Sequence, residues 1–480
     1  MRQSRQPVGP KLSHTVADDD RVQPSCCVIL AAGERSAEHR WLPAGQVGRP
    51  WPLHRVLGLS LAERTVATAQ TAGIDRFVVV LGPRPEEVRA LYERVAVGRV
   101  CRIEFVEAPD WEVGTGAMLA RARTRVPLSP FLLVRGDHLI TPGLLDRLLA
   151  EPVAPGELRL AVDRDRAALP DPEHARRVGL AGDRVTRVGA DLRWWSAAEA
   201  GAMLCPRDLF DAVEAAAADG EHSLVDGVRR LVARGQVRAA SISGEPWADV
   251  ATPGGLRVAR MRLLGSLARG RSDGFVAAHV TRRISMALTS RLADRDVSPS
   301  HVTVASFFAA LIGAGFLAAG EYRFSFVGAL LVLTAAVADG VDNALAKLTY
   351  RQTARGDWLD TVLDRYADMA VVLAVTVAEA SVVSGAGLRI WLGGSLALTG
   401  FLFASYVTKE YALRHGREYP NDVLNRLRRR DLRLFGIGCG ALLGVAFEAM
   451  VLLGLVAHLC AAGMLLRAWR RQGPFGYRAA

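Results

Sequence analysis

A series of long apolar segments in the second half of the chain is the feature that most constrains its fold. Each segment is close to the roughly 20 residues that an α-helix needs to cross the hydrocarbon core of a bilayer. The segments occupy residues 301–319, 323–345, 357–379, 387–408, 433–448 and 449–469. They predict an all-α transmembrane domain of six helices.

The first half of the chain mixes charged and apolar residues as a soluble domain does. Strand-like runs at 26–33, 77–82, 102–109 and 130–138 alternate with helix-like runs. This alternation predicts a doubly wound α/β domain with a mostly parallel sheet. Ligands of such sheets bind beyond the carboxyl ends of the strands, where this chain carries Asp137.

Changes in composition divide the chain into five parts. The expected parts are a disordered tail at 1–24, the α/β domain at 25–258, a basic linker with an amphipathic helix at 259–298, the transmembrane domain at 299–470 and a cytoplasmic tail at 471–480. The helix, predicted at 276–292, either lies on the membrane surface or is a basic solvated helix.

The net charge of +11 is typical of nucleic-acid-binding proteins as well as of membrane proteins. Here the arginines cluster beside the apolar segments, for example in the run Arg428 to Arg430. That distribution follows the positive-inside rule, so we expect a lipid bilayer and no nucleic acid as partner. It predicts a multi-pass protein of the inner or plasma membrane, with the soluble domain and the active sites on the cytoplasmic side.

Carboxylates inside the apolar half are costly and indicate function. Pairs spaced three and four residues apart share a helix face, and we expect too few cations nearby to neutralise them all. Oxygen-only ligands of this kind suit Mg²⁺ or Mn²⁺. Asp368, one turn further on, either supports the site or pairs with Arg365. The candidate metal ligands are Asp339, Asp342, Asp360 and Asp364.

This acidic stretch resembles the CDP-alcohol phosphotransferase family, whose signature is D-x2-D-G-x2-A-R-x8-G-x3-D-x3-D. The resemblance implies transfer of a phosphoalcohol group from a CDP-alcohol to an acceptor hydroxyl, with release of CMP. It also implies that all four aspartates bind metal and that Asp364 acts as the base. The matching residues are Asp339, Asp342, Ala346, Gly356, Asp360 and Asp364.

Two residues depart from that signature. Asn343 stands where the family has Gly and adds a side chain where backbone and nucleotide approach closely. Lys347 stands where the family has Arg and keeps the charge without the bidentate fork. The expected nucleotide-binding residues here are Asn343, Ala346, Lys347 and Gly356.

The α/β half resembles sugar-phosphate nucleotidyltransferases, which open on LAAGxGxR followed by PKPL. The chain has LAAGERS and then RPWPL. Four further motifs match, namely Gly114-Thr115-Gly116, Arg135-Gly136-Asp137-His138, Glu199-Ala200-Gly201 and Trp247-Ala248-Asp249. The resemblance implies metal binding by Asp137 and Asp249. It implies nucleotide binding by a set of residues in the Gly-rich loops, namely Gly33, Arg35, Gly114 and Gly116.

The first of these loops has lost residues that the chemistry uses. Arg35 replaces its second Gly, Ala37 its Arg and Trp51 the later Lys. The domain is therefore either an active cytidylyltransferase or a regulatory or scaffolding domain.

Together the two halves resemble the family of bifunctional inositol-1-phosphate cytidylyltransferases and di-myo-inositol-phosphate-phosphate synthases. This resemblance implies CTP and a CDP-alcohol such as CDP-inositol as nucleotide substrates, an inositol phosphate or lipid as acceptor alcohol, and a homodimer. Two alternatives remain open. One is a phospholipid synthase that uses CDP-diacylglycerol and carries an inactive soluble domain. The other is a non-catalytic membrane sensor of nucleotide or metal.

Overall fold

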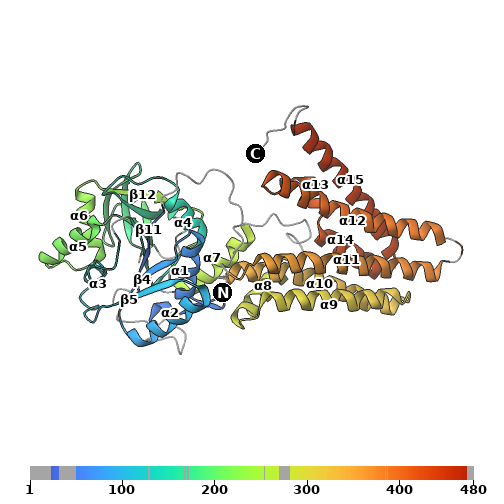
Figure 1. Cartoon of the computed structure of the whole chain (residues 1–480), viewed down its shortest axis with the longest axis horizontal. Helices are drawn as coiled ribbons and strands as arrows, with labels where there is room; N and C mark the ends of the chain where they lie inside the picture. Colours follow the sequence, from blue (N-terminus) through green and yellow to red (C-terminus); the bar gives the residue numbers. More distant parts are fainter. Residues whose placement is uncertain are drawn as a thin grey trace, which may run out of the picture. The chain divides into compact units, whose positions relative to one another are not determined.

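The structure, a computed structural model, describes residues 23–31, 50–127, 130–166, 169, 172–173, 175–252, 254–269, 282–383, 385 and 387–472. The described residues fall into two compact units, of which one ends at Arg269 and the other follows it (Figure 1). Gly33, Arg35 and Ala37 of the expected nucleotide loop lie outside the described residues, as do most of the two expected tails.

The first unit is an α/β structure. Its elements are β1 (Cys27–Leu30), η1 (Trp51–Leu53), β2 (Arg55–Val56), β3 (Leu59–Ser60), α1 (Leu61–Thr71), β4 (Arg76–Leu81), α2 (Pro85–Arg99), β5 (Arg102–Glu107), α3 (Thr115–Arg121), β6 (Phe131–Arg135), β7 (His138–Leu139), α4 (Pro142–Leu149), β8 (Leu158–Asp163), β9 (Arg177–Ala181), β10 (Arg184–Gly189), β11 (Ala197–Cys205), α5 (Asp208–Ala218), α6 (Leu224–Ala233), β12 (Val237–Ser241), β13 (Ala248–Asp249) and α7 (Gly255–Arg269).

A nine-stranded sheet runs in the order β5-β4-β1-β6-β11-β8-β12-β10-β9. The four strands expected from the sequence, β1, β4, β5 and β6, are present, and they are mutually parallel. The other half of the sheet is mixed, because β11 runs antiparallel to both β6 and β8. The β9–β10 hairpin needs only a short turn at Gly182, whose φ of +67° suits glycine.

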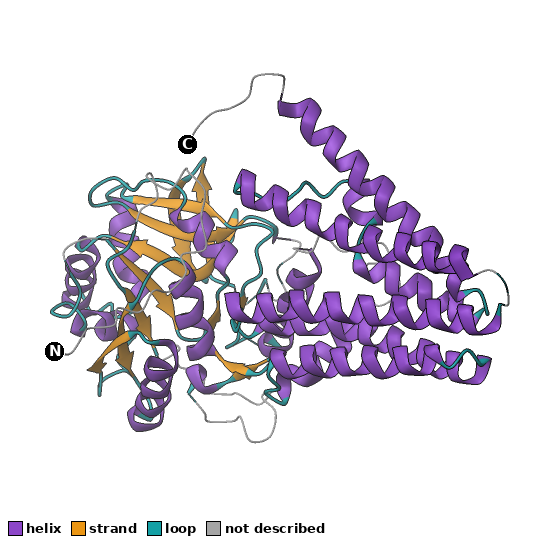
Figure 2. Ribbon diagram, turned by 45° about the vertical axis from the view of Figure 1, so that its right-hand side comes forward, coloured by secondary structure: helices purple, strands orange, loops and turns teal. Residues whose placement is uncertain are grey.

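Both faces of the sheet are buried under helices, as Figures 1 and 2 show. Successive residues of a strand point to opposite faces. Val28 and Leu30 therefore join the core beneath α3, α5 and α6, whereas Cys27 and Ile29 join the core beneath α1, α2 and α4. The doubly wound α/β prediction is confirmed, and the parallel strands β1, β4, β5 and β6 end at one edge of the sheet. The expectation of a mostly parallel sheet is wrong for the other half, where most strand pairs are antiparallel.

The second unit is helical. Its elements are α8 (Arg282–Asp294), α9 (Pro299–Ala318), α10 (Tyr322–Leu348), α11 (Ala354–Val382), α12 (Gly387–His415), α13 (Val423–Leu427), α14 (Arg430–Leu442) and α15 (Ala446–Gln472). Small residues let these helices approach closely. A Cβ on Gly328 of α10 would lie 2.7 Å from the carbonyl oxygen of Gly313 on α9, and one on Gly454 of α15 would lie 2.5 Å from Cα of Ala397 on α12.

Four described helices are long and apolar enough to cross a membrane, which makes this half membrane-embedded. The predicted count of six spans is not confirmed. α11 has sufficient length, but its first half carries several charged residues. α14 has 13 residues, which extend only about 20 Å at 1.5 Å per residue. The expected break at 448–449 is also misplaced, because the chain turns at Leu443 to Val445 around Gly444, whose φ is +77°.

A short turn joins α10 to α11 and brings the acidic stretch together. Tyr350 adopts a positive φ in this turn, and Thr353 caps α11 by accepting a hydrogen bond from the Gly356 amide at 3.0 Å. Two of the four aspartates lie in the last turns of α10 and two in the first turns of α11. The short turn between these helices therefore keeps the two pairs close together in the chain.

Candidate active sites

Three of the four predicted metal ligands of the membrane half converge. One carboxylate oxygen from each of Asp339, Asp360 and Asp364 lies within 4.8 Å of the other two. Asp339 comes from α10, whereas Asp360 and Asp364 lie one helical turn apart on α11. Carboxylate oxygens gathered from two helices in this way suit Mg²⁺ or Mn²⁺.

The fourth aspartate, Asp342, lies beside this cluster and is buried. Its Oδ2 accepts a hydrogen bond from the Thr303 hydroxyl of α9 at 2.6 Å, and its Oδ1 accepts one from the Asn343 amide at 2.5 Å. Asp342 and Asp360 both line a small cleft. A carboxylate oriented by neighbours in this way is pre-positioned for a ligand in the cleft.

The same cleft collects most of the residues predicted to bind nucleotide. Asn343, Ala346 and Gly356 line it, whereas Lys347 is exposed. The Asn343 amide group donates to the Asp339 carbonyl oxygen at 3.3 Å, so this side chain turns back toward its own helix. The substitution of Asn for Gly therefore leaves the cleft in place.

Arg430, at the start of α14, is the residue that sequence reasoning missed. Its Nη1 lies 2.8 Å from Asp339 Oδ1 and 2.6 Å from Asp364 Oδ1. The expectation of too few cations is therefore wrong for these two aspartates. The run Arg428 to Arg430 was interpreted only as a topology signal. The available clue was the position of this run. It directly precedes an apolar helix, on the side of the membrane where the acidic stretch is also predicted.

Asp368 is held by three arginines and is buried. Its oxygens lie 3.0 Å from Arg430 Nε, 3.5 Å from Arg433 Nη1 and 3.6 Å from Arg365 Nη1. The predicted pairing with Arg365 is present but is one part of a larger network. Asp368 thereby links α11 to α14 behind the three converging carboxylates.

The α/β unit has a second cluster, at the carboxyl end of β6. Asp137 follows β6, and the short β13 pairs with β7 so that Asp249 stands opposite His138. His138 lies between the two predicted ligands, with Nδ1 2.7 Å from Asp137 Oδ1 and Nε2 3.8 Å from Asp249 Oδ2. The three side chains could hold one metal ion, and His138 is a member that the sequence did not single out as a ligand.

The two carboxyl groups of this cluster differ in their electrostatics. Burial disfavours the charged form of Asp137, but Arg135 and His138 outweigh burial and hold the pKa of Asp137 well below its usual value. Burial raises the pKa of Asp249, and the neighbouring Asp137 raises it further. A bound cation would favour the ionised form of Asp249, so this pair fits a divalent metal.

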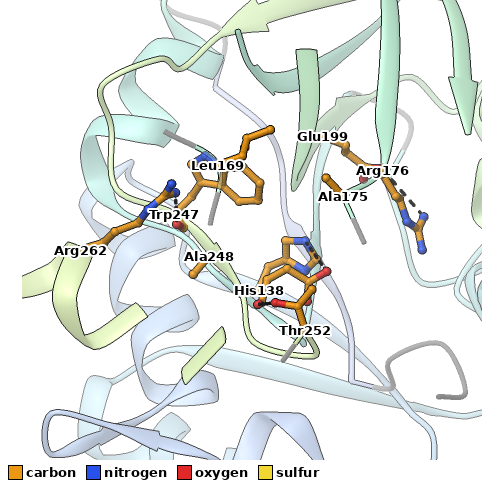
Figure 3. Close-up of a pocket in the computed structure, with 10 residues that line it drawn as sticks. His138, Leu169, Ala175, Arg176, Glu199, Trp247, Ala248, Thr252 and Arg262 are labelled. Carbon is orange, nitrogen blue, oxygen red and sulfur yellow. Dashed lines mark hydrogen bonds and ion pairs between the residues drawn. The ribbon is translucent and has the colours of Figure 1, made fainter. Parts of the chain in front are cut away.

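A pocket adjoins this cluster, and Figure 3 shows the side chains that line it. The Glu199 side chain is 3% exposed, and its Oε1 has no hydrogen-bond partner among the described residues. Arg176 lies 3.9 Å from the other oxygen of Glu199. A buried acceptor of this kind is costly unless something donates to it, and a substrate hydroxyl would do so.

The opposite side of the pocket is built by Trp247 and α7. The Trp247 indole donates to Asp163 at 2.9 Å, and Arg262 of α7 donates to the Trp247 carbonyl oxygen at 2.6 Å. The Arg262 guanidinium lies 5.5 Å from the indole centroid. Part of the segment expected as a linker, α7, therefore contributes to this pocket.

Gly114 and Gly116 are needed for a close approach of backbones. A Cβ at either position would lie within 2.7 Å of the His222 carbonyl oxygen, and the Gly116 amide donates to that oxygen at 2.9 Å. Gly114 and His222 border a cleft. The role of these glycines in nucleotide binding stays a prediction. Trp51, at the position of the family's Lys, is buried beside His54.

Gly201→Ala is expected to damage the α/β site, because Gly201 has a φ of +76° and an added Cβ would lie 2.1 Å from the His138 ring. Gly182→Ala is the matched control, since φ is +67° there and nothing lies within 4 Å of the added Cβ. We expect Gly201→Ala to cost about 1–3 kcal/mol more than the control. Thermal or denaturant unfolding of both variants measures the difference, and equal losses would show that contact with His138 does not matter.

The folds and sites define a transferase in which a nucleotidyltransferase-like α/β domain is fused to a membrane phosphotransferase part. Residues 27–239 match the family model of the MobA-like NTP transferase domain. The bifunctional IPC transferase and DIPP synthase of Rubrobacter xylanophilus is 36% identical over 444 residues, which cover 91% of this chain and 95% of that protein. The chain therefore belongs to the family of bifunctional IPC transferases and DIPP synthases, which confirms the resemblance of the whole chain.

Two further similarities cover one half each. The archaetidylinositol phosphate synthase of Methanothermobacter thermautotrophicus is 28% identical over 183 residues, which cover 38% of this chain and 88% of that protein. The solved inositol-1-phosphate CTP transferase from T. maritima covers 50% of this chain and 96% of its own, with 20% identity and a TM-score of 0.44.

Proposed function

We propose that this protein carries out two successive reactions. In the first, the α/β domain joins CTP and inositol 1-phosphate into CDP-inositol and releases pyrophosphate. In the second, the membrane part transfers the inositol phosphate group from CDP-inositol to a hydroxyl of a second inositol phosphate and releases CMP. The observation that carries the proposal is the convergence of Asp339, Asp360 and Asp364. The relative named a bifunctional IPC transferase and DIPP synthase matches both halves of the chain, which supports the pairing of the two reactions.

In the membrane site, Asp364 is proposed to accept the proton of the attacking hydroxyl. The hydroxyl oxygen then forms a bond to the phosphorus that carries the inositol, and the bridging P–O bond of the diphosphate breaks. CMP leaves with the electrons of that bond. Mg²⁺ or Mn²⁺, held by Asp339, Asp360 and Asp364 with Asp342 beside them, would supply positive charge to the diphosphate. Asn343, Ala346 and Gly356 would line the nucleotide, with Lys347 near the opening.

In the α/β site, Asp137 and Asp249 are proposed to hold the metal that neutralises the triphosphate of CTP. The phosphate oxygen of inositol 1-phosphate attacks the α-phosphorus of CTP, and the bond to the pyrophosphate breaks. Glu199 would accept a hydrogen bond from an inositol hydroxyl, since its buried Oε1 has no other donor among the described residues. Gly33, Arg35, Gly114 and Gly116 are the proposed nucleotide contacts.

The positive-inside pattern supports a cytoplasmic position for both sites, where CTP and inositol phosphate are dissolved. Fusion of the two activities would keep a charged, activated intermediate close to the site that consumes it. The homodimer implied by the family resemblance stays part of this proposal.

Mass spectrometry of products tests the proposed function. Purified protein in lipid nanodiscs is offered CTP with inositol 1-phosphate, and separately CDP-inositol with inositol phosphate. In the first reaction we expect CDP-inositol as an intermediate. In both reactions we expect CMP and a phosphodiester of two inositol units as products. Absence of the phosphodiester in both reactions would contradict the proposal.

A CDP-activated lipid as donor is the second candidate, and the similarity of the membrane half to an archaetidylinositol phosphate synthase favours it. The same protein offered CDP-diacylglycerol with inositol phosphate would then yield a phospholipid. A phospholipid product without any CDP-inositol formed from CTP would replace the first proposal by this one. The named relatives are enzymes, and a non-catalytic sensor has no comparable support.

A further inference from the structure

Arg430 occupies the position from which a divalent cation would bind the membrane carboxylates. Its Nη1 lies 2.8 Å from Asp339 Oδ1 and 2.6 Å from Asp364 Oδ1. These two residues also belong to the group of three whose oxygens lie within 4.8 Å of one another. A single guanidinium nitrogen thus bridges two of the three carboxylates that fit a metal ion.

This bridge and a metal ion between the same two oxygens exclude each other. Mg²⁺ binds carboxylate oxygens at about 2.0–2.1 Å, so an ion shared by Asp339 Oδ1 and Asp364 Oδ1 would fall close to the present place of Nη1. The Arg430 side chain is 10% exposed, and a partly buried cation beside a divalent ion is poorly screened. The guanidinium must therefore move when the ion binds.

The surroundings of Arg430 allow such a movement without releasing the side chain. Its Nε donates to Asp368 Oδ1 at 3.0 Å, and Asp368 lies outside the group of three converging carboxylates. Asp368 is itself buried and is held by Arg433 and Arg365. The Nε–Asp368 contact can persist as a pivot while Nη1 leaves Asp339 and Asp364.

We propose that Arg430 is a built-in counter-ion that exchanges with the metal. Without metal, it keeps Asp339 and Asp364 together by neutralising charges that would otherwise repel each other across α10 and α11. When metal binds, the ion takes over this role and Arg430 withdraws toward Asp368. Arg430 is thus a positioning residue that lowers metal affinity while keeping the site assembled. This inference rests on the metal site of the proposed function.

The test compares Mn²⁺ binding and unfolding of full-length protein in nanodiscs. Asp249→Asn is present in every sample to remove the metal site of the α/β domain. Arg430→Met is expected to bind Mn²⁺ roughly tenfold more tightly by calorimetry or paramagnetic resonance, because a competing cation is gone. It should also lower the unfolding temperature in EDTA, and saturating Mn²⁺ should restore most of that loss.

Arg433→Met is the matched control. Arg433 lies on the same helix and is also buried, but its acidic partner is Asp368, at 3.5 Å. Its removal should lower the unfolding temperature by the same amount in EDTA and in Mn²⁺, and should leave Mn²⁺ affinity within about twofold because the charge is farther from the ligands.

Two results would overturn the inference, and they are distinguishable. Equal or weaker Mn²⁺ binding by Arg430→Met, with a stability loss that Mn²⁺ does not restore, would show that Arg430 is a structural ion pair only. If Asp364→Asn does not reduce Mn²⁺ binding, the ion is not held by the membrane carboxylates. That result would overturn the proposed metal site itself, and the inference with it.

Discussion

Replacing Asp364 with asparagine is expected to lower CMP release from CDP-inositol by about 10²- to 10⁴-fold, the range that a positioned general base supplies. The amide cannot accept the proton of the attacking hydroxyl, and it is a weaker metal ligand than the carboxylate. Asparagine has nearly the same shape, so the packing of α11 against its neighbours should persist. The measurement is CMP released per minute from CDP-inositol and inositol phosphate.

Glu379→Gln is the control for this variant, because Glu379 lies on the same helix α11, well beyond the acidic stretch. It should release CMP at close to the wild-type rate. The Asp364 variant should still make CDP-inositol from CTP and should accumulate it. Unchanged CMP release by Asp364→Asn would remove Asp364 from the reaction.

Asp249→Asn is expected to lower CDP-inositol formation from CTP by about 10²-fold or more, because it removes a charge that holds the metal at the triphosphate. It should not lower stability. Burial raises the pKa of Asp249 in the folded protein, so its ionised form destabilises the fold at neutral pH, and a neutral amide relieves that cost. Oδ1 of the amide can still accept the hydrogen bond that the Ala251 amide now donates.

Asp137→Asn is the informative comparison. The pKa of Asp137 is held low by Arg135 and His138, so its charge stabilises the fold at any pH above that lowered pKa. Removing it leaves Arg135 buried without its partner, which costs about 3–5 kcal/mol. In Asp137→Asn, both CDP-inositol synthesis and the unfolding temperature should therefore fall. In Asp249→Asn, CDP-inositol synthesis should fall while the unfolding temperature does not. Full synthesis by Asp249→Asn would exclude Asp249 as a metal ligand.

Local patterns were sufficient to predict the four parallel strands β1, β4, β5 and β6 and the acidic helices. The continuous apolar run that includes Cys27 to Leu30 predicted a buried strand, and the spacing of Asp360 and Asp364 placed both on one side of a helix. A contact between distant segments has no such signal. Arg430 lies 66 residues beyond Asp364 in the chain, and only the packing of α14 beside α10 brings it to the aspartates.

Two other misjudgements have the same physical origin. Arg262 belongs to a basic stretch that was interpreted as a connector, but α7 packs on β13 and brings it to Trp247. The fifth span, predicted at 433–448, was expected because apolar residues continue through 433–469, although Gly444 and the turn around it leave α14 short. Composition predicts which segments are apolar, but it does not predict the residue at which a helix ends.

A double-label time course tests the central claim most directly. Wild-type protein in nanodiscs receives CTP labelled with ³²P at the α-phosphate and inositol 1-phosphate labelled with ³³P. We predict that ³²P passes from CTP through CDP-inositol into CMP, while ³³P passes through CDP-inositol into the phosphodiester product. Retention of ³²P in CTP, or ³³P that never leaves inositol 1-phosphate, would contradict the account.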